Sequence, residues 1–407
     1  MGKCGLSAES AWKQHMKILM INSVCGIRST GRICTDLAVE LEKQGHEVKI
    51  AFGRETVPAP FERFAVRIGS DTGVKLHAIR ARAFDDMGFG SKAATRRLID
   101  RIRQYDPDVI HLHNIHGYYL HIAVLFDYLK TCGKKIIWTL HDCWPFTGHS
   151  AYCEAAACAK WKTGCFDCPG TRQYPQAFTD GSQRNWRRKK ALFTAVPQLT
   201  IVTPSHWLKE LVGASFLREY PVKVIHNGID TDVFHPVKSD VKEQYGLQDT
   251  RMILGVAAAW EKRKGLDDFI LLAEKLRGDG TVVLVGLSEE QEKALLQGIV
   301  SVRVGNDVKK LAALYAAADV LVNPTYEDNY PTVNLEAIAC GTPVVTYDTG
   351  GSPESASQFG AVVAKGDIDG LKREIMRLSA DSRPNACDKA FFDKRTAILQ
   401  YMQLYKA

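Results

Sequence analysis

The chain has 407 residues, of which 45% are hydrophobic and 24% are charged, and its formal net charge is +7. This length exceeds one compact core and predicts two domains of roughly 150–200 residues each. The composition is that of an ordinary globular protein, so a disordered chain is excluded as the default. A charge this modest and this scattered argues against nucleic acid as a partner.

Basic residues gather in two short runs, Arg96–Arg103 and Arg184–Lys190. Either run can be a solvated helix face, or can attract an anionic membrane surface. No window approaches the roughly 18 apolar residues that a spanning helix needs, and Met1–His15 lacks the apolar centre of a signal peptide. We therefore expect a cytoplasmic protein that can contact the inner membrane peripherally, with residues 1–15 outside the fold.

Short apolar runs alternate with amphipathic stretches from Met16 onward. Lys17–Asn22 and Glu47–Phe52 are predicted strands, and Arg32–Gln44 between them is a predicted helix because its apolar residues recur on one face. Compact runs of Val, Ile and Leu predict further strands at Asp108–His113, Lys135–Leu140 and Thr200–Thr203.

The same alternation continues in a second series after Pro204. Its predicted strands are Val222–His226, Met252–Ala257, Thr281–Val285, Ser301–Val304, Val320–Val322 and Val344–Thr346. Its predicted helices are Gly265–Leu276, Asp307–Ala317, Asn334–Ala339, Asp367–Leu378 and Asp388–Leu404. The whole pattern predicts an α/β protein with two doubly wound, Rossmann-like domains.

We predict a first domain over residues 16–205, with 142–180 as an inserted cysteine-rich loop. A second domain is predicted over 206–385, followed by a closing helix over 386–407 that returns to the first domain. Ligands of open parallel sheets bind beyond the carboxyl ends of the strands, so the substrate is expected in the cleft between the two domains. The loops that follow the strands are therefore the candidate sites.

The loop Asn22–Gly31 follows the first strand and opens the first helix. Its small residues and glycines would let backbone N–H groups approach an anion. The loop is neither G-x-G-x-x-G nor a Lys-Ser/Thr phosphate loop, so a plain turn is an equal interpretation. Without the dinucleotide fingerprint, a dehydrogenase is disfavoured.

Two histidines stand at the ends of neighbouring predicted strands. His113 ends the strand Asp108–His113, and His141 directly follows Lys135–Leu140. The carboxyl ends of parallel strands meet at one edge, so we expect both side chains to face the cleft. A lone histidine is more often structural, but the pair favours a functional His113.

The chain has eleven cysteines, and in the absence of an export signal they indicate reduced thiols or a metal site. Four are clustered as Cys153-x4-Cys158-x6-Cys165-x2-Cys168, a spacing that can complete a tetrahedral, structural zinc site. Reduced thiols without metal and local disulfides stay open as alternatives. The others are scattered and are expected to be inert: Cys4, Cys25, Cys34, Cys132, Cys143, Cys340 and Cys387.

Polar loops in the second half are expected at one edge of one sheet. A cationic pair beside a helix N-terminus suits a diphosphate, and carboxylates accept hydrogen bonds from paired sugar hydroxyls. Each segment alone has a structural interpretation: as a solvated turn, as a helix start whose carboxylate interacts favourably with the helix dipole, or as a tight turn. Together they favour a nucleotide-sugar site, formed by His226–Phe234, Arg263–Gly265, Asp328–Glu336 and Thr349–Glu354.

At these residues the sequence resembles the retaining glycosyltransferases of the GT-B fold, of the group 1 or family 4 type, which build bacterial polysaccharides and glycolipids. The resemblance runs from Met16 to about Leu378 and is densest at Thr203–Leu208, His226–Phe234 and Tyr326–Val345. The segment Thr147-Gly-His149 with the four cysteines is similar to a subgroup found in capsule and exopolysaccharide gene clusters.

The resemblance assigns roles to the acidic residues. Glu336 matches the carboxylate that holds the ribose, and Asp328 stands at the position that approaches the transferred sugar. Asp328 is one methylene shorter than the family's residue, and Glu327 beside it is the alternative.

The resemblance also assigns a diphosphate clamp, in which Lys264 matches the family's lysine. The family's arginine lies where this chain has Ala258–Trp260, so Arg263 is expected to supply that charge. His113 matches a histidine near the anomeric carbon, and Gly31 ends the glycine loop. The predicted catalytic residues are His113, Arg263, Lys264 and Asp328, and the predicted donor-binding residues are Gly31, His141, Asn227, Glu327, Tyr330, Thr332, Val333 and Glu336.

The function implied is that of a hexosyltransferase. It would move a hexose, with retention, from a nucleoside diphosphate sugar bound by the second domain to a glycan or lipid-linked glycan on the acceptor side of the first. No metal is expected in catalysis, and Asp230-Thr-Asp232 is interpreted as structural. The alternatives are a nucleotide-sugar epimerase of the same architecture and a non-catalytic nucleotide-sugar-binding protein.

Overall fold

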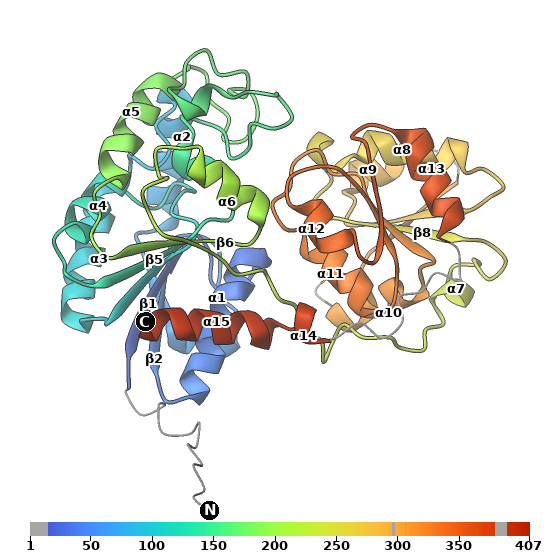
Figure 1. Ribbon diagram of the computed structural model, residues 1–407, viewed down its shortest axis with the longest axis horizontal. Helices are drawn as coiled ribbons and strands as arrows, with labels where there is room; N and C mark the ends of the chain where they lie inside the picture. The colour runs from blue at the N-terminus through green and yellow to red at the C-terminus, as the bar shows by residue number, and fades with distance from the viewer. Residues whose placement is uncertain (1–14, 295–297, 306, 379–388) are drawn as a thin grey trace, which may run out of the picture. The chain divides into compact units, whose positions relative to one another are not determined.

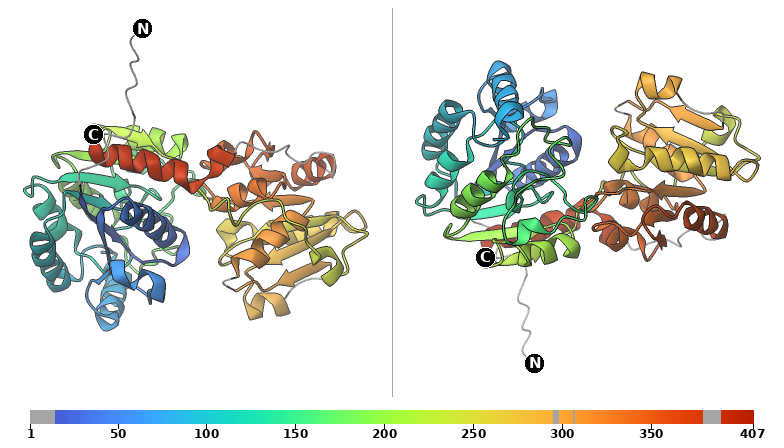
Figure 2. Two further views of the ribbon diagram at one scale, coloured as in Figure 1. Left: turned by 90° about the horizontal axis from the view of Figure 1, so that it is seen from below. Right: turned by 90° about the horizontal axis from the view of Figure 1, so that it is seen from above.

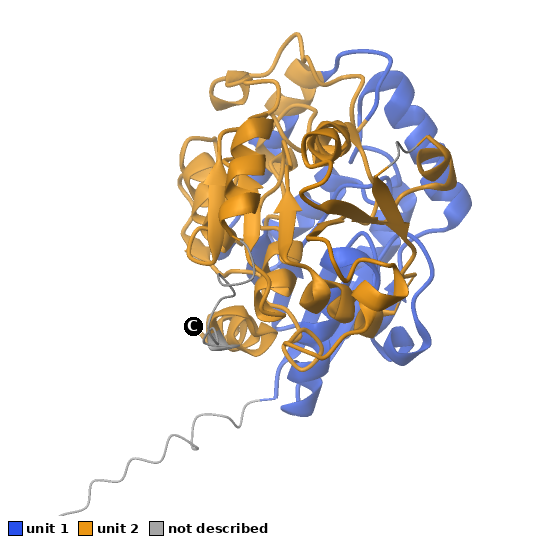
Figure 3. Cartoon of the chain, turned by 90° about the vertical axis from the view of Figure 1, so that its right-hand side faces the viewer, with its two compact units in different colours: residues 1–139, 176–181, 188–201 blue, residues 140–175, 182–187, 202–407 orange. Residues whose placement is uncertain are grey.

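The computed structural model describes residues 15–294, 298–305, 307–378 and 389–407 (Figure 1). The chain divides into two compact units (Figure 3): residues 1–139, 176–181 and 188–201 form unit 1, and residues 140–175, 182–187 and 202–407 form unit 2. Unlike the predicted ranges, this division places the cysteine-rich stretch with unit 2. This division does not test the predicted domain ranges, so 16–205, 206–385 and 386–407 stay predictions.

The first sheet has the strand order β3-β2-β1-β4-β5-β6-β7. Strand β1 lies inside it and pairs in parallel with β2 and β4, so that Ile18 is opposite both Val48 and Val109. Both faces of β1 are buried, which explains its continuous apolar sequence. The strands are β1 (Lys17–Asn22), β2 (Glu47–Phe52), β3 (Ala65–Arg67), β4 (Val109–Leu112), β5 (Lys135–Thr139), β6 (Leu199–Thr203) and β7 (Val222–Val224).

The second sheet has the strand order β10-β9-β8-β11-β12-β13, and each neighbouring pair is parallel. Because the strands are parallel, the loops that follow them emerge at one edge. The strands are β8 (Met252–Val256), β9 (Thr281–Val285), β10 (Ile299–Val302), β11 (Val320–Asn323), β12 (Val344–Tyr347) and β13 (Gly360–Val363).

Helices connect the strands of both sheets. Those up to β7 are α1 (Arg28–Lys43), α2 (Asp71–Phe84), α3 (Lys92–Tyr105), α4 (Ile122–Leu129), α5 (Ser182–Phe193) and α6 (His206–Gly213). Those after β7 are α7 (Val241–Gln244), α8 (Leu266–Lys275), α9 (Glu289–Lys293), α10 (Val308–Ala317), α11 (Thr332–Ala339), α12 (Ser352–Ala356), α13 (Ile368–Arg377), α14 (Lys389–Phe392) and α15 (Lys394–Lys406). Within the described residues, none of them combines the length and apolar character needed to cross a bilayer.

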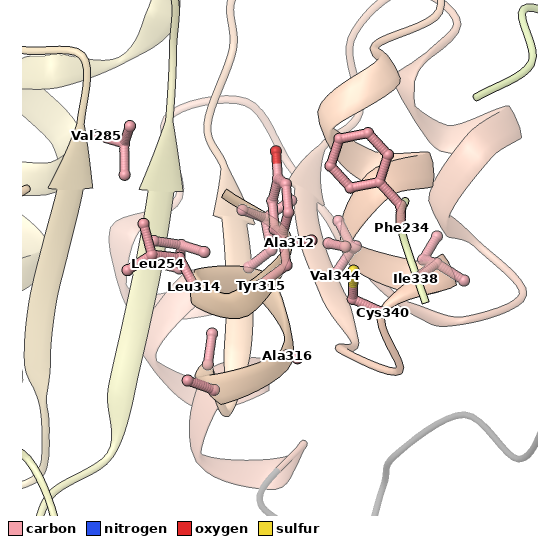
Figure 4. Close-up of a cluster of buried hydrophobic side chains, with 14 of the residues drawn as sticks. Phe234, Leu254, Val285, Ala312, Leu314, Tyr315, Ala316, Ile338, Cys340 and Val344 are labelled. Carbon is pink, nitrogen blue, oxygen red and sulfur yellow. The ribbon is translucent and has the colours of Figure 1, made fainter. Parts of the chain in front are cut away.

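The second sheet carries a hydrophobic core on each face, and Figure 2 shows helices on both faces. Leu254 of β8 belongs to the core under α10 and α11, whereas its neighbour Ile253 belongs to the core under α8 and α13. This alternation follows from the period of two in a strand. Figure 4 shows part of the first core, in which Tyr315 lies among apolar side chains near Phe234.

The predicted α/β class and parallel sheets are confirmed, but some elements differ. Val222–Val224 forms an edge strand of the first sheet, so its assignment to the second series was wrong. The short strands β3 and β13 were not predicted. The predicted helix Asp388–Leu404 begins at a residue outside the described ones, and its described part is divided into α14 and α15 at Asp393. The Asp393 carboxylate caps α15 by accepting the Arg395 N–H at 2.7 Å.

Candidate active site

Glycines bring the loops at the edge of the second sheet into direct backbone contact. Gly265 has φ +74°, and a β-carbon there would overlap the carbonyl oxygen of Pro324. A β-carbon at Gly350 would likewise overlap the carbonyl oxygen of Asp328. Only glycine fits such approaches, so the Arg263–Gly265 and Thr349–Glu354 loops pack on the segment that follows β11.

Lys264 and Asp328 form an ion pair at this edge. The Lys264 Nζ lies 2.5 Å from the Asp328 Oδ2, and the two side chains are only 23% and 17% exposed. Lys264 ends the short 3-10 turn η4 (Lys262–Lys264), which Gly265 closes. The structure therefore brings together two of the predicted catalytic residues across 64 positions of sequence.

Arg263 is held differently from its neighbour. Its Nε donates to the Glu261 Oε2 at 2.8 Å, and its side chain is 42% exposed. Its carbonyl oxygen accepts the Tyr326 N–H at 2.8 Å. The backbone of Arg263 thus ties η4 to the loop after β11, while its guanidinium pairs with a carboxylate of its own turn.

Glu336 lies on α11 and is oriented by a tyrosine of α10. The Tyr315 hydroxyl donates to the Glu336 Oε2 at 2.8 Å. Burial, and then the neighbouring Glu336 carboxylate, raise the pKa of Tyr315 well above its usual value. The phenol therefore keeps its proton and acts as a donor at any physiological pH.

The N-terminus of α11 carries no side-chain cap. The helix begins at Thr332 after Pro331, with no side-chain cap and no acidic residue in its first turn. Its first-turn amides, those of Thr332 and Val333, lie at the positive end of the helix dipole. This end of the helix follows Asp328 directly in the chain.

Tyr330 and Asn227 contact each other within unit 2. The Tyr330 ring stacks on the His226 ring, with centroids 4.7 Å apart and 19° between the planes. The Asn227 Nδ2 donates to the Tyr330 carbonyl oxygen at 3.4 Å. Tyr330 is buried, so its ring serves packing, and the predicted contact of Tyr330 with the donor would have to come from its backbone.

Glu327 has a different hydrogen-bond partner from Asp328. Its Oε1 accepts the Ala155 N–H at 3.4 Å, and burial is the main cause that raises the pKa of this carboxyl. Asp328, by contrast, faces the ammonium of Lys264. The geometry favours Asp328 over Glu327 as the first acidic residue.

His141 lies two residues after β5 and contacts the loop after β11 through its backbone. Its carbonyl oxygen accepts from the Asn329 Nδ2 at 3.2 Å and from the Tyr152 hydroxyl at 3.3 Å. The Ser205 hydroxyl in turn donates to the Asn329 Oδ1 at 2.5 Å. Asn329 therefore joins the β11 loop to two other loops of unit 2.

His113 and Gly31 lie in unit 1. His113 follows β4 and is buried, with its ring centroid 4.0 Å from that of His111. Gly31 lies in the first turn of α1, where a β-carbon would come 3.0 Å from a methyl of Val24. Both stand after strands of the first sheet, as predicted, and their meeting with the Lys264 pair stays a prediction.

One group of three possible metal ligands occurs near these loops. Ligand atoms of His206, His226 and Glu354 lie within 4.8 Å of one another. The Glu354 carboxylate also accepts the N–H groups of His206 at 2.8 Å and Trp207 at 2.7 Å, at the start of α6. These backbone bonds give Glu354 a structural role as a cap from another loop.

Several residues that support the site were not predicted from the sequence. In the sequence, Tyr315 has the pattern of an apolar helix residue, and Asn329 has that of an ordinary loop residue. Glu154 and Lys365 pair with each other at 3.2 Å, although they are 211 positions apart. Only the nearness of Asn329 to Asp328 offered a signal, because long-range pairs leave no local pattern.

Comparison with known proteins matches both halves of the chain. Residues 30–233 match the family model described as Glycosyltransferase Family 4, and residues 250–381 match the model described as Glycosyl transferases group 1. WcaC of Escherichia coli K12, whose name places it as a glycosyl transferase of colanic acid biosynthesis, is 24% identical over 80% of this chain and 78% of its own length.

Solved structures share the fold. Sucrose-phosphate synthase from Thermosynechococcus elongatus aligns with a TM-score of 0.71 at 19% identity, over 96% of this chain and 98% of that one. HepE of Anabaena, solved with UDP-glucose, aligns with a TM-score of 0.63 at 16% identity, over 96% of this chain and 100% of that one.

Two sheets of parallel strands with these structural neighbours define the GT-B fold. The chain belongs to Glycosyltransferase Family 4, whose model matches half of it, and its second half matches the group 1 model. The resemblance stated from the motifs, the GT-B fold and the enzyme class are confirmed.

Proposed function

We propose that this glycosyltransferase moves a hexose from a nucleoside diphosphate sugar to a hydroxyl of a glycan or lipid-linked glycan, with retention, in bacterial polysaccharide biosynthesis. The name of WcaC supports the pathway. The complex of HepE with UDP-glucose supports a nucleotide-sugar donor. A glycosyltransferase family match favours transfer over the epimerase and non-catalytic alternatives.

The observation that carries the proposal is the Lys264–Asp328 pair, which directly precedes the uncapped N-terminus of α11 in the chain through Asp328. A bound diphosphate would take the Lys264 ammonium and the first-turn amides of α11, because both offer positive charge to its oxygens. Asp328 would then be released to accept hydrogen bonds from sugar hydroxyls. As the bond to the sugar breaks, Lys264 would stabilise the charge that grows on the diphosphate.

Glu336 suits the ribose of the nucleotide. A carboxylate accepts hydrogen bonds from two adjacent hydroxyls, and Tyr315 fixes the rotamer of this one. The distance along α11 from Thr332 to Glu336 is a little over one helical turn, so a ribose and its diphosphate could contact one helix together.

Catalysis is proposed to need neither a metal nor a covalent carboxylate nucleophile. The two carboxylates of the Asp-x-Asp segment pair with basic residues of α15: Asp230 with Lys394 at 2.8 Å, and Asp232 with Arg395. These ion pairs support a structural role for the segment. We propose a same-face route in which the leaving diphosphate assists removal of the acceptor proton, with His113 orienting the sugar.

The acceptor is proposed to be anionic and lipid-linked. Unit 1 has a hollow of about 550 Å³ between α2 and α3, lined by Arg67, Lys92, Arg97 and Arg101 among others. On α2, which forms one wall, Leu76, Ile79 and Phe84 are 63%, 66% and 60% exposed. Cations beside apolar side chains suit a phosphorylated lipid at a membrane surface, which would also account for peripheral membrane contact.

Replacement of Lys264 by Ala tests the donor site. We expect donor turnover to fall about 100-fold, since charge stabilisation at the leaving group is lost. Lys262→Ala, in the same 3-10 turn but exposed, is the matched control and should keep its activity. Equal activity of the two variants would contradict the assignment of Lys264.

Two separate measurements test the metal-free reaction and the retention of the anomeric configuration. Turnover of the parent enzyme should be unchanged by EDTA, and the product should keep the anomeric configuration of the donor when examined by NMR. Abolition by EDTA would contradict the first statement, and an inverted product the second. Incubation with donor alone separates transfer from epimerisation, because an epimerase would change the sugar without an acceptor.

A further inference from the structure

Three possible metal ligands of unit 2 come from separate segments of the chain. His206 begins α6, His226 follows β7, and Glu354 lies in α12. One ligand atom of each lies within 4.8 Å of the other two, and His206 is exposed while the others are half-buried. All three belong to unit 2, and the steps proposed for the transfer use none of their side chains.

The ring of His226 has the tautomer that a metal ligand needs. Its Nδ1 lies 2.8 Å from the Pro204 carbonyl oxygen, and a carbonyl can only accept, so Nδ1 carries the proton of the neutral ring. The lone pair is then on Nε2, which is the nitrogen left to bind a cation. A hydrogen bond from the second ring nitrogen is the usual outer contact of a metal-bound histidine. The Tyr330 ring, stacked at 4.7 Å between centroids, fixes the plane of the imidazole.

Glu354 is oriented and still has capacity for a cation. Its two oxygens accept one backbone N–H each, from His206 at 2.8 Å and from Trp207 at 2.7 Å. A carboxylate offers about four lone-pair sites, so both oxygens can accept a further partner. The negative charge of Glu354 also offsets the positive end of the α6 dipole, which alone would disfavour a cation there.

His206 is the adjustable member of the group. Its ring centroid lies 5.8 Å from that of His226. Zinc bonds to nitrogen and oxygen of about 2.0–2.2 Å place tetrahedral ligand atoms about 3.4 Å apart, so the three atoms have to draw slightly closer together. Because the His206 side chain is exposed, rotation about its own bonds can bring its ring nitrogen to the metal without moving the backbone.

We propose that His206, His226 and Glu354 bind one Zn²⁺, which ties the start of α6 to the loop after β7 and to α12. Imidazole nitrogens suit a divalent transition metal, whereas Mg²⁺ and Ca²⁺ prefer sets of oxygen ligands. Two histidines and one glutamate leave the fourth position of a tetrahedron to water. The ion takes no part in the transfer and acts as a brace within unit 2.

Calorimetric titration of the full chain with Zn²⁺ tests the binding. The protein is first stripped with a chelator and kept reduced with a phosphine. His206→Ala removes one ligand but keeps the backbone N–H that Glu354 accepts, so it should weaken Zn²⁺ binding at least about 100-fold, which exceeds the usual effect of losing an outer contact. His226→Phe, whose ring can still stack on Tyr330, should have the same effect. His235→Ala, at a half-buried histidine of the same unit, is the matched control and should bind like the parent.

Zinc at the predicted cysteine site needs a different signature. In the described part of the chain, the four clustered cysteines form no disulfide and no group of ligand atoms within 4.8 Å. Zinc at these residues stays a prediction: Cys153, Cys158, Cys165 and Cys168.

Co²⁺ separates the two sites, because thiolate ligands add a strong near-ultraviolet charge-transfer band that imidazole and carboxylate lack. Co²⁺ at the proposed site should give visible absorption that is lost in His206→Ala and in His226→Phe. A thiolate band alone, unchanged in both variants, would place the metal on the cysteines and overturn the proposal. Equal Zn²⁺ affinity of His206→Ala and the parent would also overturn it, as would displacement of Zn²⁺ by millimolar Mg²⁺.

Hydrogen exchange tests the brace. Zn²⁺ should slow exchange of the Trp207 amide about tenfold in the parent, because the metal fixes the carboxylate that accepts this N–H. It should have no such effect in His206→Ala, and amides of α8 should not respond in either protein. Unchanged exchange in the zinc-bound parent would refute the tie to α12. None of these measurements uses donor or acceptor, so their outcome is independent of the proposed function.

Discussion

Two charged regions of the molecule differ in how many of their cations are paired with a carboxylate. At the donor edge of unit 2, Lys264 pairs with Asp328 and Arg263 with Glu261. In the hollow of unit 1, Arg67 pairs with Asp71, whereas Lys92 and Arg97 make no ion pair with a carboxylate in the described part of the chain, and both are exposed.

The difference concerns what a ligand must displace. An anion that enters the donor edge has to compete with Asp328 for Lys264, so binding rearranges an existing ion pair. An anion that enters the hollow replaces only water around Lys92 and Arg97. The first region is suited to selectivity, because a ligand must also satisfy the released carboxylate. The second is suited to attraction of any anionic surface, and its strength should depend on salt.

The first prediction concerns His77, which also lines the hollow and which we expect to be neutral, so that Lys and Arg side chains alone supply the positive charge there. The His77 Nε2 accepts the Gly90 N–H at 3.0 Å, so its Nδ1 carries the proton and faces the Ser91 hydroxyl at 3.0 Å. Burial, only partly opposed by Asp86, lowers the pKa of His77 to about 4. The folded state therefore resists protonation.

As the pH falls below about 6.5, the unfolded chain binds a proton at His77 before the folded chain does. Unit 1 should lose stability from there down to pH 4, by about 3 kcal/mol in total, and should be unaffected above pH 6.5. His77→Gln, whose amide oxygen can accept the Gly90 N–H, should remove this loss. Amide exchange protection of α2 at pH 6.5 and pH 4 measures it, and equal losses in both proteins would refute the neutral hollow.

The second prediction breaks the pairing at the donor edge. Asp328→Asn should lower the turnover of the donor sugar about 100-fold, an effect of about 2.7 kcal/mol, because the sugar loses its acceptor carboxylate. The same change should tighten the binding of the nucleoside diphosphate alone, since Lys264 is no longer occupied. Calorimetric titration and steady-state rates check the two halves.

Asp267→Asn removes an exposed carboxylate in the first turn of α8 and serves as the control. Weaker binding of the diphosphate in Asp328→Asn would mean that Asp328 holds Lys264 in place for the ligand. Asp328 would then assist diphosphate binding by positioning Lys264, and would not compete with the diphosphate for it.

The third prediction tests the unpaired cations. The double variant Lys92→Ala, Arg97→Ala should weaken binding to vesicles that contain an anionic phospholipid about tenfold, or about 1.4 kcal/mol. Donor binding should not change. Arg96→Ala, on the same helix but outside the hollow, is the matched control. Cosedimentation at two salt concentrations measures the effect, and an equal loss in the control would show general charge attraction only.

The sequence predicted the sheets well where strands are long and buried. Strands β1, β2 and β9 begin and end at the expected residues because their apolar runs stop at polar or glycine residues. Strand β3, Ala65–Arg67, is short and half-buried, so it carries no such run. The assignment of β7 failed because chain order does not determine which sheet an edge strand joins.

The sequence predicted which loops form the candidate site, but not which side chains pair with one another within it. The Arg263–Gly265, Asp328–Glu336 and Thr349–Glu354 loops do pack together, since parallel strands place their loops at one edge. The partner of each charge depends on side chains from distant elements. Tyr315 contacts Glu336, and Glu154 contacts Gly350, only because the fold brings distant parts of the chain together. No periodicity or spacing in the sequence indicates such contacts.

The smallest predicted effect concerns the support of Glu336. Tyr315→Phe removes a single hydroxyl that donates to the Glu336 Oε2 and leaves the packing against Phe234 intact. A hydrogen bond to a charged group contributes on the order of 1.5 kcal/mol, and part of it should appear as a KM for the donor about fivefold higher, with kcat unchanged. Phe234→Leu disturbs the same core without touching the carboxylate. If both variants raised KM equally, disturbance of the core packing would explain the change. The hydrogen bond from Tyr315 to Glu336 would then make no separate contribution to donor binding.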